Sequence, residues 1–270
     1  MIENKISIIT VTFNVIDTIE ETILSVINQN DTNFEYIIID GGSTDGTLDI
    51  IEKYQDDIAY WHSKPDNGIY DAMNKGVRVS NGNFINFLGG DDVFINNNVL
   101  SKVRLFLQDA KKIYYGNVLF KKRNVIYDGQ FNSFKIVTRN ISHQSIFYPT
   151  KVFEEFTFNT SYKIYADYDL NLKLYNHSLF SFKFIPVLIT LFNDEGLSGM
   201  NTKDINFEKD RLNIIKNHFS FCIYFYRKSR TIISLIMCKV NKYKFNRFVL
   251  INMILAIISY SISLLQDYKN

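Results

Sequence analysis

The chain begins with an apolar stretch, after which apolar residues recur at helical spacing. Residues 6–13 (ISIITVTF) are apolar or β-branched almost throughout, which predicts a buried strand. Asp17 and Glu20 then have the spacing of a helix capping box. Apolar residues follow three and four positions apart, at Ile19, Ile23, Val26 and Ile27. This pattern predicts a strand, a turn and a helix.

The same unit recurs further along the chain. Each apolar stretch ends in a turn rich in Gly, Asp, Asn or Ser, and residues at helical spacing follow the turn. Strands that alternate with helices favour a mainly parallel sheet with right-handed crossovers. The expected elements are strands over 35–40, 58–64 and 83–88, and helices from about Thr47 and over 69–79.

Carboxylates follow two of these strands directly. Asp40 ends one strand, and Asp91 with Asp92 follows another after two glycines. The carboxyl ends of parallel strands meet at one edge of the sheet, where open α/β sheets bind their ligands. We therefore expect these aspartates to share a binding edge.

The second half of the chain has a different pattern. After residue 112 it becomes rich in strands, and a helix from about Asp167 and a strand near 182–192 follow. Residues 248–265 form an uncharged run of 18, at the lower limit for a membrane-spanning helix and also suited to a helix in a membrane interface. Two C-terminal helices packed on a core are the alternative. We expect an α/β domain over 1–207 and a helical, basic extension over 208–270.

Charge divides the chain in the same way. Residues 1–210 carry 20 Lys or Arg and 27 Asp or Glu, a net charge of −7. Residues 211–270 have a net charge of +9, which suits an anionic membrane leaflet. The two cysteines, Cys222 and Cys238, have no metal-ligand or disulfide-framework spacing, and the N-terminus has no signal-peptide pattern. We expect a reducing compartment and no secretion.

The adjacent carboxylates of GGDD (89–92) need a physical explanation. Like charges repel, and partial burial pushes one of them toward protonation unless a cation holds both. Mg²⁺ and Mn²⁺ prefer oxygen ligands, and Mg²⁺ takes one or two protein carboxylates and completes its shell with phosphate oxygens and water. We interpret GGDD as a metal-diphosphate site. A solvated turn is the alternative if these four residues are considered alone.

Six segments occur in a fixed order: IITVTFN, IIIDGGSTDGT, NKG, FLGGDD, HQSIFY and YKIYADYDLNLKLY. As an ordered set, over about residues 5–195, they resemble the family 2 glycosyltransferases. The likeness is greatest to bacterial polysaccharide transferases of the O-antigen, capsule and colanic-acid type. The resemblance implies the GT-A nucleotide-sugar-binding fold, with a mainly parallel central sheet flanked by helices. It also implies a nucleoside-diphosphate sugar as donor and Mn²⁺ or Mg²⁺ as cofactor.

The resemblance assigns donor-binding roles to residues near the first strands. Phe13 would stack on uracil with Thr10 beside it, and Asp40 would accept a hydrogen bond from the base. For Asp40 the alternative is a turn residue, and for Asp45 a helix cap is the favoured interpretation. The remaining donor residues would be Asp66, Asn74 and Lys75, for which a turn residue and exposed helix residues are the alternatives.

The resemblance also assigns the chemistry. Asp92 would hold the metal and Asp91 would lie near the ribose or complete the site, although Gly89 stands where relatives have an acidic residue or Asn. Asp167 would be the catalytic base, and its alternative is a carboxylate that favours the helix N-terminus. Ala166 replaces a Glu that many relatives have beside this base. His143, Gln144 and Asp169 are candidate contacts to phosphate or acceptor.

The expected reaction is a direct displacement that inverts the anomeric carbon. We expect the acceptor to be a saccharide, carried on a polyprenyl diphosphate, at the cytoplasmic face of the cell membrane. A nucleic-acid partner is not expected. One alternative is a sugar kinase, suggested by IDGGST, and another is a metal-dependent nucleotidyltransferase. The non-enzymatic alternative is a membrane-surface binding module.

Overall fold

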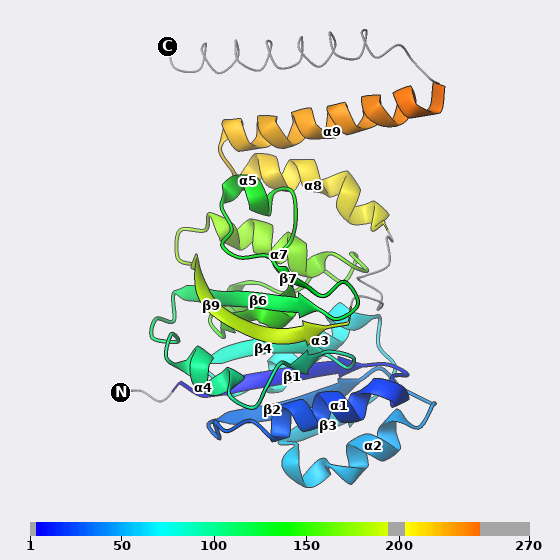
Figure 1. Ribbon diagram of the computed structural model, residues 1–270, viewed down its shortest axis with the longest axis vertical. Helices are drawn as coiled ribbons and strands as arrows, with labels where there is room; N and C mark the ends of the chain where they lie inside the picture. Colours follow the sequence, from blue (N-terminus) through cyan, green and yellow to red (C-terminus); the bar gives the residue numbers. More distant parts are fainter. Residues whose placement is uncertain (1–3, 194–202, 244–270) are drawn as a thin grey trace.

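Strand β1 (Ile6–Thr12) lies in the middle of a parallel group of four strands. Its neighbours are β2 (Phe34–Asp40) and β4 (Phe84–Gly89), and β3 (Tyr60–Ser63) pairs with the outer side of β2. The carboxyl ends of β1, β2 and β4 therefore meet at one edge, as the sequence predicts. The computed structural model describes residues 4–193 and 203–243 (Figure 1).

The described strands form one sheet in the order β3-β2-β1-β4-β8-β6-β9-β5, with β7 paired to β6. The parallel arrangement predicted for the sheet holds for its first four strands, and the second half is mixed. The pairs β4–β8, β6–β8, β6–β7 and β5–β9 are antiparallel, and β6–β9 is parallel. The remaining strands are β5 (Val93–Phe94), β6 (Lys112–Phe120), β7 (Val125–Tyr127), β8 (Ile146–Pro149) and β9 (Ser181–Phe192).

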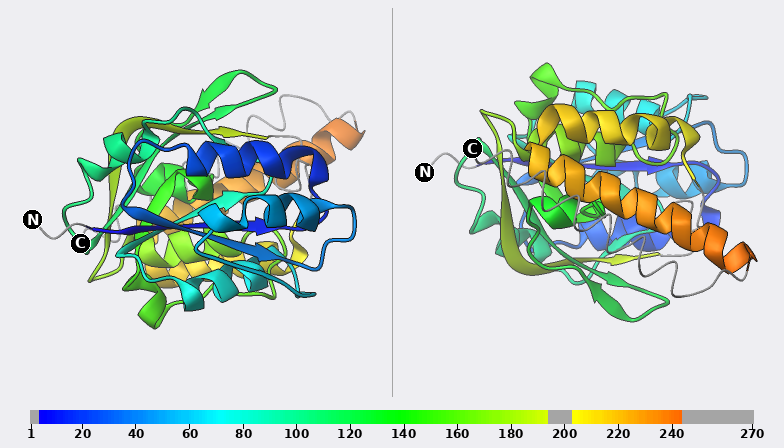
Figure 2. Two further views of the ribbon diagram at one scale, coloured as in Figure 1. Left: turned by 90° about the horizontal axis from the view of Figure 1, so that it is seen from below. Right: turned by 90° about the horizontal axis from the view of Figure 1, so that it is seen from above.

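Helices cover both faces of the sheet (Figures 1 and 2). Side chains alternate along a strand, so Ile8 packs toward α1, α2 and α4, whereas Ile9 packs toward α3 and α7. The helices are α1 (Ile16–Ile27), α2 (Thr47–Lys53), α3 (Ile69–Val79), α4 (Val99–Arg104), α5 (Ser133–Ile136), α6 (Val152–Glu155), α7 (Ala166–Tyr175), α8 (Ile205–His218) and α9 (Phe221–Tyr243). Two short 3₁₀ helices are η1 (Gln55–Asp57) and η2 (His143–Ser145).

Gly76 explains part of the NKG segment. A Cβ on Gly76 would lie 2.5 Å from Cγ2 of Ile9, so only a glycine lets α3 approach β1 this closely. Asn74, in the same segment, donates to the carbonyl of Phe158 at 2.9 Å and accepts from its N–H at 3.0 Å. The NKG segment therefore ties α3 to the sheet and to the loop before α7.

The capping box predicted for the first helix is wrong. Asp17 lies within the first turn of α1, and the residue at the N-cap is Val15. Side chains of the following unit cap the helix instead. Thr47 Oγ1 accepts from the N–H of Val15 at 3.0 Å, and Asp45 accepts from the N–H of Ile16 at 3.0 Å. Asp45 also accepts from the N–H of Thr47 at the start of α2, which agrees with its predicted role as a cap.

The C-terminal helices pack on the domain. The expected boundary at 207/208 falls inside α8, whose Phe207, Ile214 and Ile215 belong to the same core as α3 and α7. Helix α9 lies against α8 and α5 at the end of the molecule opposite α2 (Figures 1 and 2). None of the helices in the described ranges is both long and apolar enough to cross a membrane. The apolar run 248–265 lies outside those ranges.

Candidate active site

Asp91 and Asp92 stand at the end of β4, beside the end of β1. The N–H of Gly90 donates to the carbonyl of Val11 at 3.2 Å, which holds the turn against β1. Asp92 is 2% exposed, and its Oδ2 accepts from Gln144 Nε2 at 2.8 Å. Asn193, at the end of β9, donates from its N–H to Asp92 Oδ1 at 3.0 Å and from Nδ2 to Asp91 Oδ2 at 3.2 Å. The two carboxylates are thus fixed from two sides.

The electrostatics of this pair favour a cation. Burial, and then the charge of Asp91, raise the pKa of Asp92 to about 6. Burial also raises the pKa of Asp91. Both carboxylates bend over Gly89, where a Cβ would lie 2.8 Å from Asp92 Oδ2 and 3.0 Å from Asp91 Oδ1. Two oxygens that converge in this way suit a divalent ion.

Across the described ranges, no group of three or more His, Cys, Asp or Glu side chains is placed to hold a metal. The pair Asp91 and Asp92 still fits Mg²⁺, because this ion usually takes one or two carboxylates and keeps water or phosphate oxygens on its other positions. Among the described residues, a metal at this site would therefore be held by this pair, with its other positions open to further ligands.

Asp167 occupies the first turn of α7 and is 5% exposed. Its Oδ1 lies 2.8 Å from the hydroxyl of Tyr70, and its Oδ2 accepts from Asn140 Nδ2 at 2.7 Å. Nδ1 of His143 lies 3.5 Å from the same Oδ2. The carboxylate is held from α3, from the loop after α5 and from η2.

Two adjacent residues of η2 connect the carboxylate sites. Gln144 donates to Asp92, and His143 faces Asp167. Burial lowers the pKa of His143. The hydrogen bond and charge of Asp167, with the charges of Asp92 and Asp91, raise the pKa by more than burial lowers it, so the net pKa lies above the ordinary value. Its Nε2 is buried and has no hydrogen-bond partner within residues 4–193 and 203–243. Such a group can donate to an anionic ligand.

An exposed aromatic ring follows β1 at the same edge of the sheet. Phe13 follows β1 and is 61% exposed. A Cβ on Gly41 would lie 3.3 Å from the ring of Phe13 and 2.9 Å from Asp66 Oδ2, so these two side chains flank one glycine. The open ring and the carboxylate beside it can contact a planar base and its sugar.

Asp40 is fully buried at the end of β2. Its carboxylate accepts from the hydroxyls of Thr12, Ser43 and Ser63 and from the N–H groups of Gly42 and Ser43. These hydrogen bonds outweigh the effect of burial and lower the pKa of Asp40. Asp40 therefore organises the loop after β2, which agrees with its alternative interpretation as a turn residue.

Four of the predicted site residues lie elsewhere in the structure. Thr10 is buried within β1 and accepts from the hydroxyl of Tyr36 at 3.1 Å. The side-chain amide of Asn74 is engaged by Phe158, as described above. Lys75 pairs with Asp71 at 3.1 Å on α3. Asp169 points away from Asp167 on α7 and pairs with Lys173 at 2.6 Å.

Three site residues were missed from the sequence: Tyr70, Asn140 and Asn193. Asn193 directly follows the apolar strand β9, which is the same signal that identified Asp40 and Asp91. Tyr70 and Asn140 carry no such signal, because only the folded chain brings them to Asp167.

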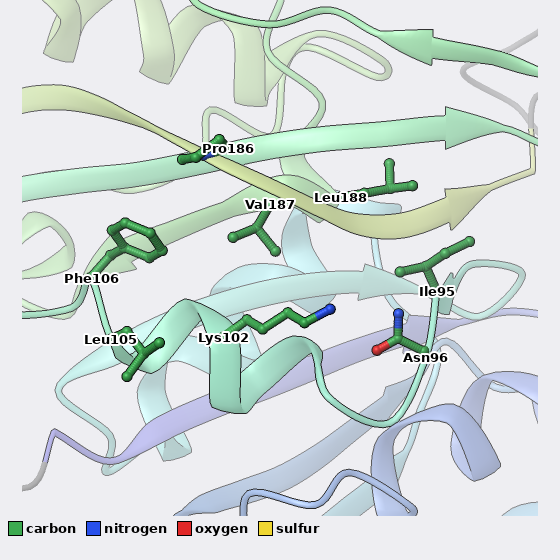
Figure 3. A pocket seen from close by; sticks show the side chains of 8 residues that line it. All are labelled: Ile95, Asn96, Lys102, Leu105, Phe106, Pro186, Val187 and Leu188. Carbon is green, nitrogen blue, oxygen red and sulfur yellow. The ribbon is translucent and has the colours of Figure 1, made fainter.

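A surface pocket of about 420 Å³ lies apart from these residues, between α4 and β9 (Figure 3). It is lined mainly by apolar side chains, and the Lys102 side chain extends along it. None of the carboxylates described above lines it. The lining residues are Ile95, Asn96, Lys102, Leu105, Phe106, Pro186, Val187 and Leu188.

Comparison with known proteins gives a consistent result. Residues 7–180 match the family described as "Glycosyl transferase family 2". A PGL/p-HBAD biosynthesis glycosyltransferase of Mycobacterium tuberculosis is 32% identical over 197 residues, which cover 70% of this chain and 77% of the relative.

Solved structures agree on the fold. Staphylococcus aureus TarS (residues 1–349) matches with a TM-score of 0.69 at 18% identity, over 84% of this chain and 71% of that one. Its complex with UDP-GlcNAc matches with a TM-score of 0.67 at 19% identity, over 82% and 66%. The mannosyltransferase PcManGT of Pyrobaculum calidifontis, in complex with GDP-Man and Mn²⁺, matches with a TM-score of 0.58 at 15% identity, over 84% and 65%.

Proposed function

Because the chain belongs to glycosyl transferase family 2, we propose that it moves a sugar, with inversion, from a nucleoside-diphosphate sugar to a saccharide acceptor. UDP-hexose is the donor we favour. The observation that carries this proposal is the linkage of Asp92 and Asp167 through the adjacent residues Gln144 and His143. A site for the diphosphate and a site for the acceptor hydroxyl then lie side by side, as a single displacement requires.

The donor base stacks on Phe13, beside Asp66. The exposure of this ring supports the assignment, since an apolar face left open at a strand end suits a planar ligand. The TarS structure with UDP-GlcNAc, which has the same fold, also supports a uridine nucleotide.

Asp92, with Asp91, would hold Mn²⁺ or Mg²⁺ at the diphosphate. When bound, such an ion neutralises the charge that grows on the departing diphosphate. The raised pKa of Asp92 and the convergence of both carboxylates over Gly89 support this site. The Mn²⁺ in the PcManGT complex is a parallel from a protein of the same fold.

Asp167 acts as the general base. It takes the proton of the acceptor hydroxyl while the acceptor oxygen forms a bond to the anomeric carbon. The bond from that carbon to the diphosphate oxygen breaks, and its electron pair leaves with the nucleoside diphosphate. His143 lies between the two carboxylate sites and donates from Nε2 to the donor phosphate. An α-linked donor sugar gives a β-linked product.

The acceptor in this proposal is carried on a polyprenyl diphosphate, and the protein acts at the cytoplasmic face of the cell membrane in the synthesis of a surface polysaccharide. Helix α9 supports a peripheral or monotopic attachment. It contains Arg227, Lys228 and Arg230 and has no acidic residue, and its Phe221 side chain is exposed. Basic and apolar side chains on one helix bind an anionic leaflet.

A donor screen tests the proposal. The purified full chain is given UDP-, GDP- and dTDP-sugars with Mn²⁺ and a synthetic saccharide on a lipid diphosphate, and acceptor-dependent nucleotide release is measured. We expect Asp92→Asn and Asp167→Asn to lower the rate at least about 100-fold. Asp210→Asn is the matched control, because Asp210 also accepts from a tyrosine hydroxyl, that of Tyr162 at 2.8 Å, but lies on α8. Transfer at the wild-type rate by both site variants would refute the proposal.

A further inference from the structure

A directed chain of hydrogen bonds ends on Asp167. The hydroxyl of Tyr148 donates to Asn171 Oδ1 at 2.7 Å, and Asn171 Nδ2 donates to Asn140 Oδ1 at 2.9 Å. Asn140 Nδ2 then donates to Asp167 Oδ2 at 2.7 Å. Tyr148 and Asn171 are fully buried. Water is therefore a poor substitute for these partners.

The Asp167 end sets the direction of the chain. An ionised carboxylate only accepts hydrogen bonds, whereas each amide group has one donating and one accepting end. With the NH₂ of Asn140 facing Asp167, the oxygen of Asn140 accepts from Asn171, and the oxygen of Asn171 accepts from the hydroxyl of Tyr148. All the donors of the chain therefore point toward Asp167.

Tyr70 approaches the other oxygen of Asp167. Its hydroxyl lies 2.8 Å from Oδ1 and also contacts the carbonyl of Ile164. Burial, and then the charge of Asp167, raise the pKa of Tyr70 well above its ordinary value, so Tyr70 keeps its proton and remains a donor. The two oxygens of Asp167 therefore face donors from two separate elements, which fixes the plane of the carboxylate.

We propose that Asn140 and Tyr70 are positioning residues that fix the plane of the Asp167 carboxylate and orient it toward the acceptor hydroxyl. The inference rests on the proposed role of Asp167 as the base. It also explains how this chain functions with Ala166, a residue that has no polar group beside the base. The Asp167 carboxylate is instead held by Tyr70 of α3 and by Asn140 of the loop after α5.

Other titratable groups also face Asp167 and enter its pH dependence. His143 Nδ1 lies 3.5 Å away, and the charge of Asp167 contributes to the raised pKa values of Tyr148 and Tyr165. His143, Tyr148 and Tyr165 are the same in the wild type and in a variant of Tyr70 or Asn140. A difference between their profiles therefore reports on the removed donor.

Tyr70→Phe and Asn140→Leu test the proposal in the full chain. Each removes one donor to the carboxylate and nearly preserves size. We expect kcat to fall about 10-fold, since a hydrogen bond to a charged group is worth about that factor, while KM for the donor sugar stays within about 2-fold. The acid limb of the pH profile should move to higher pH, because the ionised form has lost a donor. Tyr162→Phe, which removes the matched hydroxyl at Asp210, should change neither kcat nor the profile.

A readout without substrate separates this inference from the proposed function. In protein labelled at the aspartate carboxyl carbons, the NMR signal absent from Asp167→Asn reports on Asp167 alone. We expect its titration midpoint to move to higher pH in Tyr70→Phe and Asn140→Leu. An unmoved midpoint in both variants would overturn the inference even if Asp167→Asn is inactive. Should Asn140→Leu fail to fold, Tyr148→Phe interrupts the chain at its far end, and a midpoint unchanged there and in Tyr70→Phe would overturn it equally.

Discussion

Gln144 donates from Nε2 to Asp92 Oδ2 at 2.8 Å, and both side chains are buried. Groups that hold a metal ligand in place commonly affect metal affinity about 10–100-fold. We therefore predict that Gln144→Leu raises the Mn²⁺ concentration for half-maximal activity at least about 10-fold. A metal titration at saturating donor measures it. At saturating metal, KM for the donor should stay near that of the wild type, and an unchanged metal requirement would show that Gln144 has no part in the site.

Asp92 predicts a pH dependence of stability. Its pKa of about 6 lies above the ordinary 3.8, so the folded state binds this proton more tightly than the unfolded state. Stability from this group is therefore present at low pH and is lost as the pH rises from about 4 to about 6. Without metal, Asp92→Asn should be more stable than the wild type at pH 7.5, by roughly 2 kcal/mol, and similar to it at pH 4.

Thermal unfolding in EDTA at both pH values measures this difference. Mn²⁺ with UDP should then stabilise the wild type more at pH 7.5 than at pH 5, because only the ionised pair binds the cation. If Asp92→Asn is less stable than the wild type at pH 7.5 in EDTA, the interpretation that burial destabilises the ionised form of Asp92 is wrong.

Gly89 has no side chain at the point where the two carboxylates converge. A Cβ there would lie 2.8 Å from Asp92 Oδ2 and 3.0 Å from Asp91 Oδ1, closer than atoms pack without moving. Gly89→Ala should displace both oxygens and lower kcat/KM about 10-fold or more, since a small misplacement of catalytic groups is costly. Steady-state kinetics with a thermal melt of the same variant measures both effects.

Gly76→Ala is the contrasting variant. Its Cβ would lie 2.5 Å from Ile9 Cγ2 inside the core, so we expect a loss of about 1–3 kcal/mol in stability with a smaller change in kcat. The assignment of Gly89 to the site would be wrong if both variants lost stability and activity in the same proportion.

Phe13 predicts a change in donor binding alone. Stacking of a base on an aromatic ring is worth about 1–3 kcal/mol, so Phe13→Ala should raise KM for the donor about 10-fold with little change in kcat. Leu105→Ala is a suitable control, because Leu105 is 72% exposed and lines the pocket of Figure 3 instead. Equal effects of the two variants on KM would remove Phe13 from the donor site.

The sequence predicted the α/β fold, and the comparisons confirm it as the GT-A fold. Continuous apolar runs located β1, β2 and β4, which are buried almost throughout, and the pattern after the preceding turn located α3. Strand-end carboxylates also predicted Asp91 and Asp92, since the carboxyl ends of parallel strands meet at the edge where open α/β sheets bind their ligands. These features depend on neighbours within one element, which is why the sequence reveals them.

The rest depends on contacts between distant residues. Asn193 reaches Asp92 across 101 positions, and Tyr70 reaches Asp167 across 97, so no local pattern identifies them. Local patterns also do not show which way a side chain points. Asp169 is two residues after Asp167, and side chains two positions apart on a helix point about 200° apart. Asp169 thus faces Lys173 rather than the site.

Helix α9 leads to a prediction about membranes. Lys228 lies one helical turn before Ile232, which is 39% exposed. Arg230 donates to the hydroxyl of Tyr226 at 3.2 Å, and Phe134 of α5, 50% exposed, packs on the same Tyr226 with ring centroids 5.0 Å apart. Basic residues beside exposed apolar ones bind anionic bilayers, at about 1 kcal/mol per Lys or Arg. The double variant Lys228→Glu and Arg230→Glu should therefore lower binding to anionic vesicles at least about 10-fold.

Flotation of the full chain with vesicles of phosphatidylglycerol and phosphatidylcholine measures this binding, with phosphatidylcholine alone as the uncharged comparison. Lys151→Glu with Lys111→Glu changes charge equally away from α9 and should float like the wild type; if the α9 variant floats equally well, this helix does not provide the contact.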